Sequence, residues 1–84
     1  MKLFKLNNQY SITCESKGTR SGFKHEAVLF SNGHEIGRNK ICYLNRTWES
    51  YEYESVIKKI INVNFKEKEA QRFINKVNPY YKGV

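Results

Sequence analysis

The chain has 84 residues, of which 39% are apolar and 14% aromatic, enough for one modest core but not for a deep cleft between domains. Fifteen Lys and Arg residues against eight Glu residues give a formal net charge of +7, which favours an anionic partner such as nucleic acid, an anionic membrane or an acidic protein surface. The alternative is that the lysines only solvate a small protein. We expect residues 1–84 to form a single small basic domain.

The first segment, "MKLFKLNNQY", has no long apolar core and no small-residue cleavage site, so we do not expect a signal peptide. No segment approaches the roughly 20 apolar residues of a membrane span. The expectation is a cytoplasmic protein of the host cell, without a membrane partner or a cofactor. In such a chain Cys14 and Cys42 should be free, buried thiols, a disulfide between neighbouring strands being the alternative.

Three β-strands are predicted in the first half of the chain. Gln9–Ser16 alternates apolar and polar residues as an amphipathic strand does, and Leu3–Leu6 either extends it or forms a short strand of its own. Residues 17–22 form a loop with two glycines and two bases. Phe23–Phe30 and His34–Leu44 are the second and third predicted strands.

A tight hairpin is predicted at Asn32–Gly33, because a two-residue type I′ turn needs positive φ at both central residues. Simple pairing across this turn sets Leu29 opposite Ile36. Ile36 and Ile41 have opposite parity and cannot share one face of a regular strand. We therefore expect a β-bulge near Gly37–Asn39.

The apolar spacing changes to that of a helix after residue 45. Thr47 or Ser50 is the expected N-cap of a first helix, and Asn64 that of a second, which Asn78–Pro79 should end. The fold class predicted is α+β, with a three-stranded antiparallel sheet followed by two C-terminal helices. The apolar stripes of the two helices are Tyr53, Val56, Ile57, Ile60 and Ile61, then Ala70, Phe73, Ile74 and Val77.

The dense stretch "YLNRTWESYEYESVIKKI" combines a tryptophan, three tyrosines and three glutamates at the predicted corner between strand and helix. Its second half is explained by the helix core. Arg46, Trp48 and Tyr51 are a candidate partner-binding patch, since these residue types are enriched at binding hot spots. The alternative is that Trp48 closes the end of the core and Arg46 pairs with Glu49 or Glu52.

This stretch resembles an element found in small, mostly uncharacterised phage and prophage proteins of low-GC Gram-positive bacteria. The resemblance covers about a quarter of the chain. It implies an accessory protein of a mobile element, a class whose members commonly bind and inhibit host factors, including restriction and CRISPR nucleases, or bind nucleic acid. It carries no site residue with it. The matching positions are Tyr43, Asn45, Arg46, Thr47, Trp48, Glu49, Tyr51, Tyr53, Ser55 and Val56.

A second candidate surface is a basic sheet face that would contact nucleic acid. Lys17 and Lys24 would touch phosphates together with Arg20, and Arg38 or Lys40 would reach base edges. The alternative is a solvated sheet face without a ligand.

Catalytic and metal signatures are weak. His25 and His34 lack the spacing of a zinc site with the two cysteines. Glu49, Glu52 and Glu54 do not converge on one face of a helix, and the chain has no Asp for a metal-dependent nuclease.

We therefore expect a non-enzymatic mobile-element protein that binds and modulates a host protein or protein–nucleic-acid complex, of the anti-CRISPR or anti-restriction type. The alternatives are a direct DNA- or RNA-binding module and a structural or oligomeric phage component. The pattern does not fix the oligomeric state.

Overall fold

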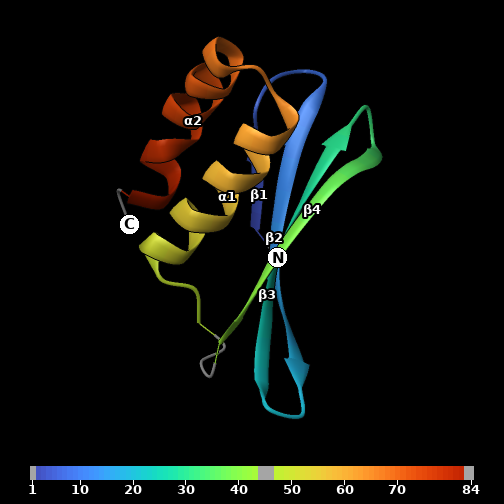
Figure 1. The fold of residues 1–84 in the computed structure, drawn as a ribbon, viewed down its shortest axis with the longest axis vertical. Helices are drawn as coiled ribbons and strands as arrows, with labels where there is room; N and C mark the ends of the chain where they lie inside the picture. The colour runs from blue at the N-terminus through green and yellow to red at the C-terminus, as the bar shows by residue number, and fades with distance from the viewer. Residues whose placement is uncertain (1, 44–46, 83–84) are drawn as a thin grey trace.

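The fold has two layers: a four-stranded antiparallel sheet and a pair of helices that cover one of its faces (Figure 1). The computed structural model describes residues 2–43 and 47–82. Neither helix in this part of the chain has the length and apolar character needed to cross a membrane. The elements in chain order are β1 (Lys2–Lys5), β2 (Tyr10–Thr19), β3 (Gly22–Ser31), β4 (His34–Tyr43), α1 (Ser50–Asn64) and α2 (Glu67–Lys82).

The sheet has one strand more than expected. The α+β class and the two C-terminal helices are confirmed, but a three-stranded sheet is wrong, because β1 pairs antiparallel with β2 from Lys2–Cys14 to Lys5–Ser11. The side chain of Asn7 makes this reversal possible: its Oδ1 accepts the N–H groups of residues 9 and 10 at 2.8 and 2.7 Å. Such an Asx turn separates the first apolar run from the second.

The hairpin at Asn32–Gly33 is confirmed, with φ of 50° and 83° at its two central residues. The bulge is also present in β4, one position earlier than predicted. Leu29 pairs with Gly37 and not with Ile36, and Phe30 pairs with Glu35, so that Ile36 is the extra residue. The bulge turns Ile36 out to 47% exposure and restores the alternation that follows.

The core lies between the inner face of the sheet and the helices. Both apolar helix stripes are confirmed, with Tyr53 partly buried and the other members buried. The sheet contributes Ile12, Cys14, Ala27 and Leu29 from β2 and β3, and Phe4 from β1.

The two cysteines are free, as expected, but only Cys14 is buried. Cys42 lies on the other face of β4 and is exposed, so its predicted burial is wrong. Burial raises the pKa of the Cys14 thiol from 9.0 to about 12, against a smaller lowering effect of the Lys2 charge.

The helix ends differ from the predicted ones. Glu49 is the N-cap of α1, in a capping box with Glu52, whereas Thr47 and Ser50 were expected. Asn64 is the last residue of α1 and not the N-cap of α2. Pro79 lies inside α2, which continues to Lys82, so the predicted end at Asn78–Pro79 is wrong.

Candidate binding surfaces

Trp48 lies inside an aromatic stack at the corner that leads into α1. Its ring is stacked on His25 at 4.5 Å and on Tyr53 at 4.7 Å between centroids, with interplanar angles of 17° and 15°. Phe4 meets the Tyr53 ring edge-on at 5.7 Å. Both faces of the indole are thus covered. Burial raises the pKa of the Tyr53 hydroxyl, and the nearby Cys14 and Glu52 raise it further.

The structure describes two members of the predicted patch of Arg46, Trp48 and Tyr51. Trp48 is half-buried in the stack, whereas Tyr51 is 59% exposed in the first turn of α1. Arg46 lies outside the described residues. A partner-binding role for the three side chains stays a prediction.

A buried histidine–glutamate contact lies beneath Trp48. His25 Nδ1 is 2.6 Å from Glu52 Oε2, and these side chains are 0% and 3% exposed. The other carboxylate oxygen of Glu52 accepts the N–H of Glu49 at 3.3 Å. Glu52 therefore joins β3 to the first turn of α1 and completes the cap of that helix.

Sequence reasoning missed this pair. The sequence patterns indicate His25 only as a weak candidate for metal or catalytic chemistry, and Glu52 as a partner for Arg46 or a member of a carboxylate cluster. The parity of His25 with Ala27 and Leu29 on the inner face was the signal that could have shown that the imidazole is buried.

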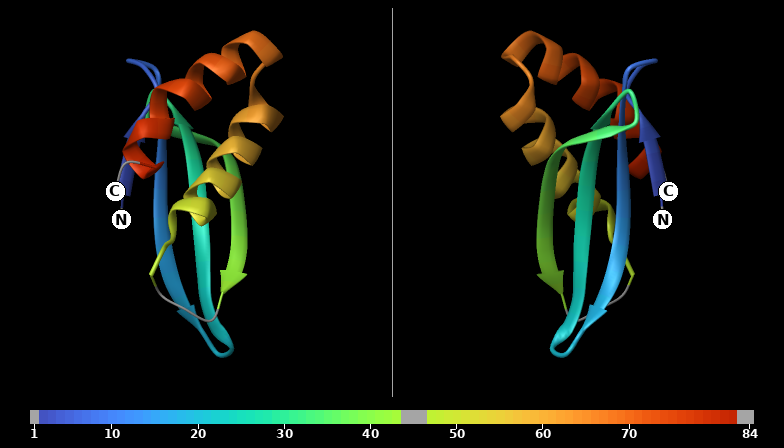
Figure 2. Two further views of the ribbon diagram at one scale, coloured as in Figure 1. Left: turned by 90° about the vertical axis from the view of Figure 1, so that its left-hand side faces the viewer. Right: turned by 90° about the vertical axis from the view of Figure 1, so that its right-hand side faces the viewer.

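Neither helix of the described residues covers the second face of the sheet, which is called the bare face below (Figure 2, right). Side chains that alternate with the core residues project from it, among them Lys17, Lys24, Arg38 and Lys40. Lys17 pairs with Lys24 across β2 and β3, and Lys40 pairs with Glu26 across β3 and β4. The structure thus gathers four of the predicted nucleic-acid-binding residues on one face.

Arg20 lies apart from these four, in the turn that joins β2 to β3. This turn extends past the helices at the far end of the sheet (Figure 1).

Glu26 is the centre of an ion-pair network on the bare face, although it is only 1% exposed. Its carboxylate contacts the Arg38 guanidinium and lies 3.2 Å from Lys24 Nζ. Arg38 also binds Glu35, with Nη2 2.6 Å from Oε1. Most of this basic charge is therefore neutralised by acids on the same face.

Further bases of this face are Lys5 of β1, opposite Ser11, together with Lys17 and Lys40. Lys17 is 3.4 Å from Glu15 on the same strand. Lys40 makes no ion pair with any residue in the described part of the chain. The bare face consequently alternates positive and negative groups, and it lacks the uniform potential that phosphate backbones select.

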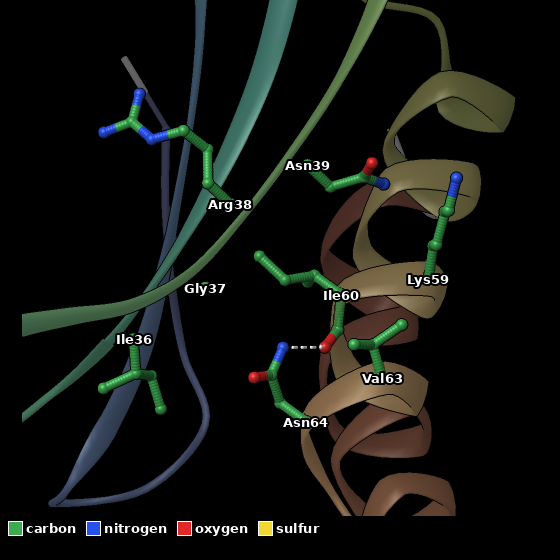
Figure 3. Close-up of a pocket in the computed structure, with 8 residues that line it drawn as sticks. All are labelled: Ile36, Gly37, Arg38, Asn39, Lys59, Ile60, Val63 and Asn64. Atoms are coloured by element: carbon green, nitrogen blue, oxygen red, sulfur yellow. Dashed lines mark hydrogen bonds between the residues drawn. The ribbon is translucent and has the colours of Figure 1, made fainter.

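A groove of about 280 Å³ runs between β4 and α1 (Figure 3). It is lined by Ile36, Gly37, Arg38 and Asn39 of β4 and by Lys59, Ile60, Val63 and Asn64 of α1.

Among residues 2–43 and 47–82, no three His, Cys or Glu side chains come together as a metal-binding group. Comparison of the chain with protein-family models, curated proteins and solved structures found no match.

Proposed function

We propose that this chain is a non-enzymatic accessory protein of a mobile element, which binds a host protein, or the protein part of a protein–nucleic-acid complex, through the bare face of its sheet. The observation that carries this proposal is the ion-pair network on Glu26. A buried carboxylate holds Lys24 and Arg38 in place on a surface that no helix covers.

The network favours a protein partner for two physical reasons. Side chains already held by ion pairs lose less conformational freedom when a partner binds, so the face is partly preorganised. A pattern of mixed charges also selects a partner with the complementary pattern and rejects others by placing like charges together. A regulator of one host enzyme needs this kind of selectivity.

Nucleic acid is the second candidate partner, supported by the bases near the β2–β3 turn. Lys17 and Lys24 are cross-strand neighbours, Arg20 lies in the adjoining turn, and Lys40 lacks an ion pair among the described residues. The acids Glu15 and Glu26 lie between these bases and weaken the attraction for phosphates. This second function therefore predicts weak, strongly salt-dependent binding.

The proposal is tested by partner capture with charge-reversed variants. The immobilised protein is exposed to a nuclease-treated host lysate, and captured proteins are identified by mass spectrometry. Lys17→Glu with Lys40→Glu changes the bare face, whereas Lys68→Glu with Lys76→Glu makes the same charge change on exposed positions of α2.

We expect a protein that the wild type and the α2 variant capture and that the sheet-face variant loses at least tenfold. Equal capture by both variants, or capture only from a parallel lysate that has not been treated with nuclease, contradicts binding of a protein through this face.

A further inference from the structure

The groove between β4 and α1 combines an unpaired strand edge with an apolar surface. In the sheet order β1-β2-β3-β4, β4 has a neighbouring strand on one side only. Its other edge carries backbone N–H and C=O groups that a further strand can pair with. Helix α1 lies alongside this edge, so a segment that enters the groove meets both a backbone ladder and helix side chains (Figure 3).

Two apolar side chains of the groove are exposed. Val63 is 75% exposed and Ile36 47%, and they stand on opposite sides of the groove, with buried Ile60 between them (Figure 3). The bulge is what places Ile36 there, because a regular strand would pair it in the ladder. Both side chains would lose water contact against an apolar residue of a bound segment.

The spacing between β4 and α1 is fixed by two contacts. A Cβ atom on Gly37 would lie 2.8 Å from Asn64 Nδ2, so α1 approaches the backbone of β4 closely at one end. The Asn64 amide is itself held by the Ile60 carbonyl at 2.7 Å. At the other end Asn39 points towards α1 and its Nδ2 donates to the Val56 carbonyl at 3.5 Å, whereas Arg38 points away from the helix (Figure 3). The groove is thus a preformed feature of the fold.

The charge of the groove selects between possible occupants. Lys59 is exposed on its helical side and has no ion pair within the described residues. A second copy of this chain would bring the Arg38 and Lys40 side chains of one β4 edge against those of another. Like charges in such a pair are destabilising, whereas an acidic strand meets Lys59 with opposite charge.

We infer that the groove between β4 and α1 binds an extended, acidic segment of a partner protein, which pairs with β4 as a fifth strand. Apolar side chains of the segment contact Ile36 and Val63, and an acidic one contacts Lys59. Strand addition of this kind draws affinity from the backbone and specificity from alternate side chains. The groove lies at the sheet edge and not on the bare face, so its occupancy does not depend on the proposed function.

The inference is tested with short labelled peptides and the full chain. The probe alternates glutamate with valine. One control has lysine for glutamate, and the other has two adjacent central prolines, one of which removes an N–H from whichever side of the peptide faces β4. We expect fluorescence anisotropy to show saturable binding of the glutamate peptide below about 1 mM. In NMR spectra the amide signals of residues 36–41 should shift and exchange more slowly with solvent.

Substitutions then locate the site. Val63→Ser should weaken binding about tenfold through lost apolar contact, while Leu3→Ser, a change at an exposed apolar position on the opposite edge strand, leaves it unchanged. Lys59→Glu should weaken it about fivefold, while Lys68→Glu has no effect. These positions are exposed, so the variants should fold, which circular dichroism checks.

Several results overturn the inference. If the lysine peptide binds with the same affinity as the glutamate peptide, the occupant need not be acidic. If the proline peptide does so, the occupant does not pair with β4 as a strand. If the glutamate peptide does not bind, or if Val63→Ser and Lys59→Glu leave its affinity unchanged, the groove is not a binding site for such a segment. Self-association in sedimentation experiments that Val63→Ser abolishes would assign the groove to a second copy of the chain.

Discussion

The two faces of the sheet each bury a glutamate, and they do so in different ways. On the helix side, Glu52 is 3% exposed and its partner His25 is fully buried beneath Trp48. On the bare side, Glu26 is 1% exposed, but the side chains of its partners Lys24 and Arg38 remain 29% and 44% exposed. In the first pair both groups have lost water; in the second only the carboxylate has.

The difference separates stability from recognition. When both members of a pair are buried, removal of either one lowers the free energy of unfolding strongly, because the other stays out of water and has lost this contact. The cations of the outer network can return to water when Glu26 changes, so the cost to folding is smaller. We expect the inner pair to hold α1 on the sheet and the outer network to shape a binding face.

The largest expected effect comes from breaking the inner pair. Glu52→Ala should lower the free energy of unfolding by about 3–5 kcal/mol, since His25 stays buried and the helix cap is lost. Chemical denaturation measures this change. Glu54→Ala removes a partly exposed pair with Lys58 on the same helix and should cost about 0.5 kcal/mol. Similar small losses in both variants would show that the inner pair does not anchor α1.

Trp48→Ala should have the next largest effect, with a loss of about 3 kcal/mol, at the lower end for a tryptophan because the ring is only half-buried. The nearby Tyr51→Ala changes an exposed ring and should stay within about 0.5 kcal/mol. Thermal and chemical unfolding provide the comparison. A Trp48→Ala variant that keeps full stability but no longer captures the partner would contradict this structural role and indicate that Trp48 binds the partner.

Glu26→Gln tests the outer network and should cost about 1–2 kcal/mol, less than Glu52→Ala, because Lys24 and Arg38 can rehydrate. Denaturation gives the stability, and the capture experiment on the same variant gives the binding. We expect partner binding to fall more than stability does. A loss as large as that of Glu52→Ala would erase the distinction between the two faces.

The smallest expected effect is a loss of stability at alkaline pH, which comes from the Cys14 thiol. Because the folded pKa is raised from 9.0 to about 12, the protonated thiol stabilises the fold fully below pH 9.0, and this contribution is lost as the pH rises through about 12. By about pH 10 the loss should be about 1 kcal/mol relative to neutral pH. In Cys14→Val, unfolding measured across the same range should show a correspondingly weaker decline.

The sequence predicted the elements whose signals are local. Asn32–Gly33 has one favoured turn, and the apolar stripes of both helices follow from their spacing. The fourth strand depended on the Asn7 side chain, which decides between one long strand and two short ones. The helix ends were wrong because the Glu49–Glu52 capping box competed with Thr47 and Ser50.

The candidate surfaces were less accessible to sequence reasoning, because they depend on tertiary contacts. Strand alternation could place Lys17, Lys24, Arg38 and Lys40 on one face, but not the burial of Glu26 among them. The stack of Trp48 on His25 joins β3 to the corner before α1, and no spacing in the sequence reports it. The groove likewise arises only when α1 lies beside the edge of β4.

The measurement that tests the central claim most directly is a fluorescence titration with short duplex DNA, single-stranded DNA and RNA at about 50 and 200 mM salt. The mixed charge of the bare face predicts weak binding without saturation at micromolar concentrations. It also predicts equal behaviour of the sheet-face variant, with Glu at residues 17 and 40, and the α2 variant, with Glu at residues 68 and 76. Micromolar binding that collapses at the higher salt and is lost only in the sheet-face variant would contradict it.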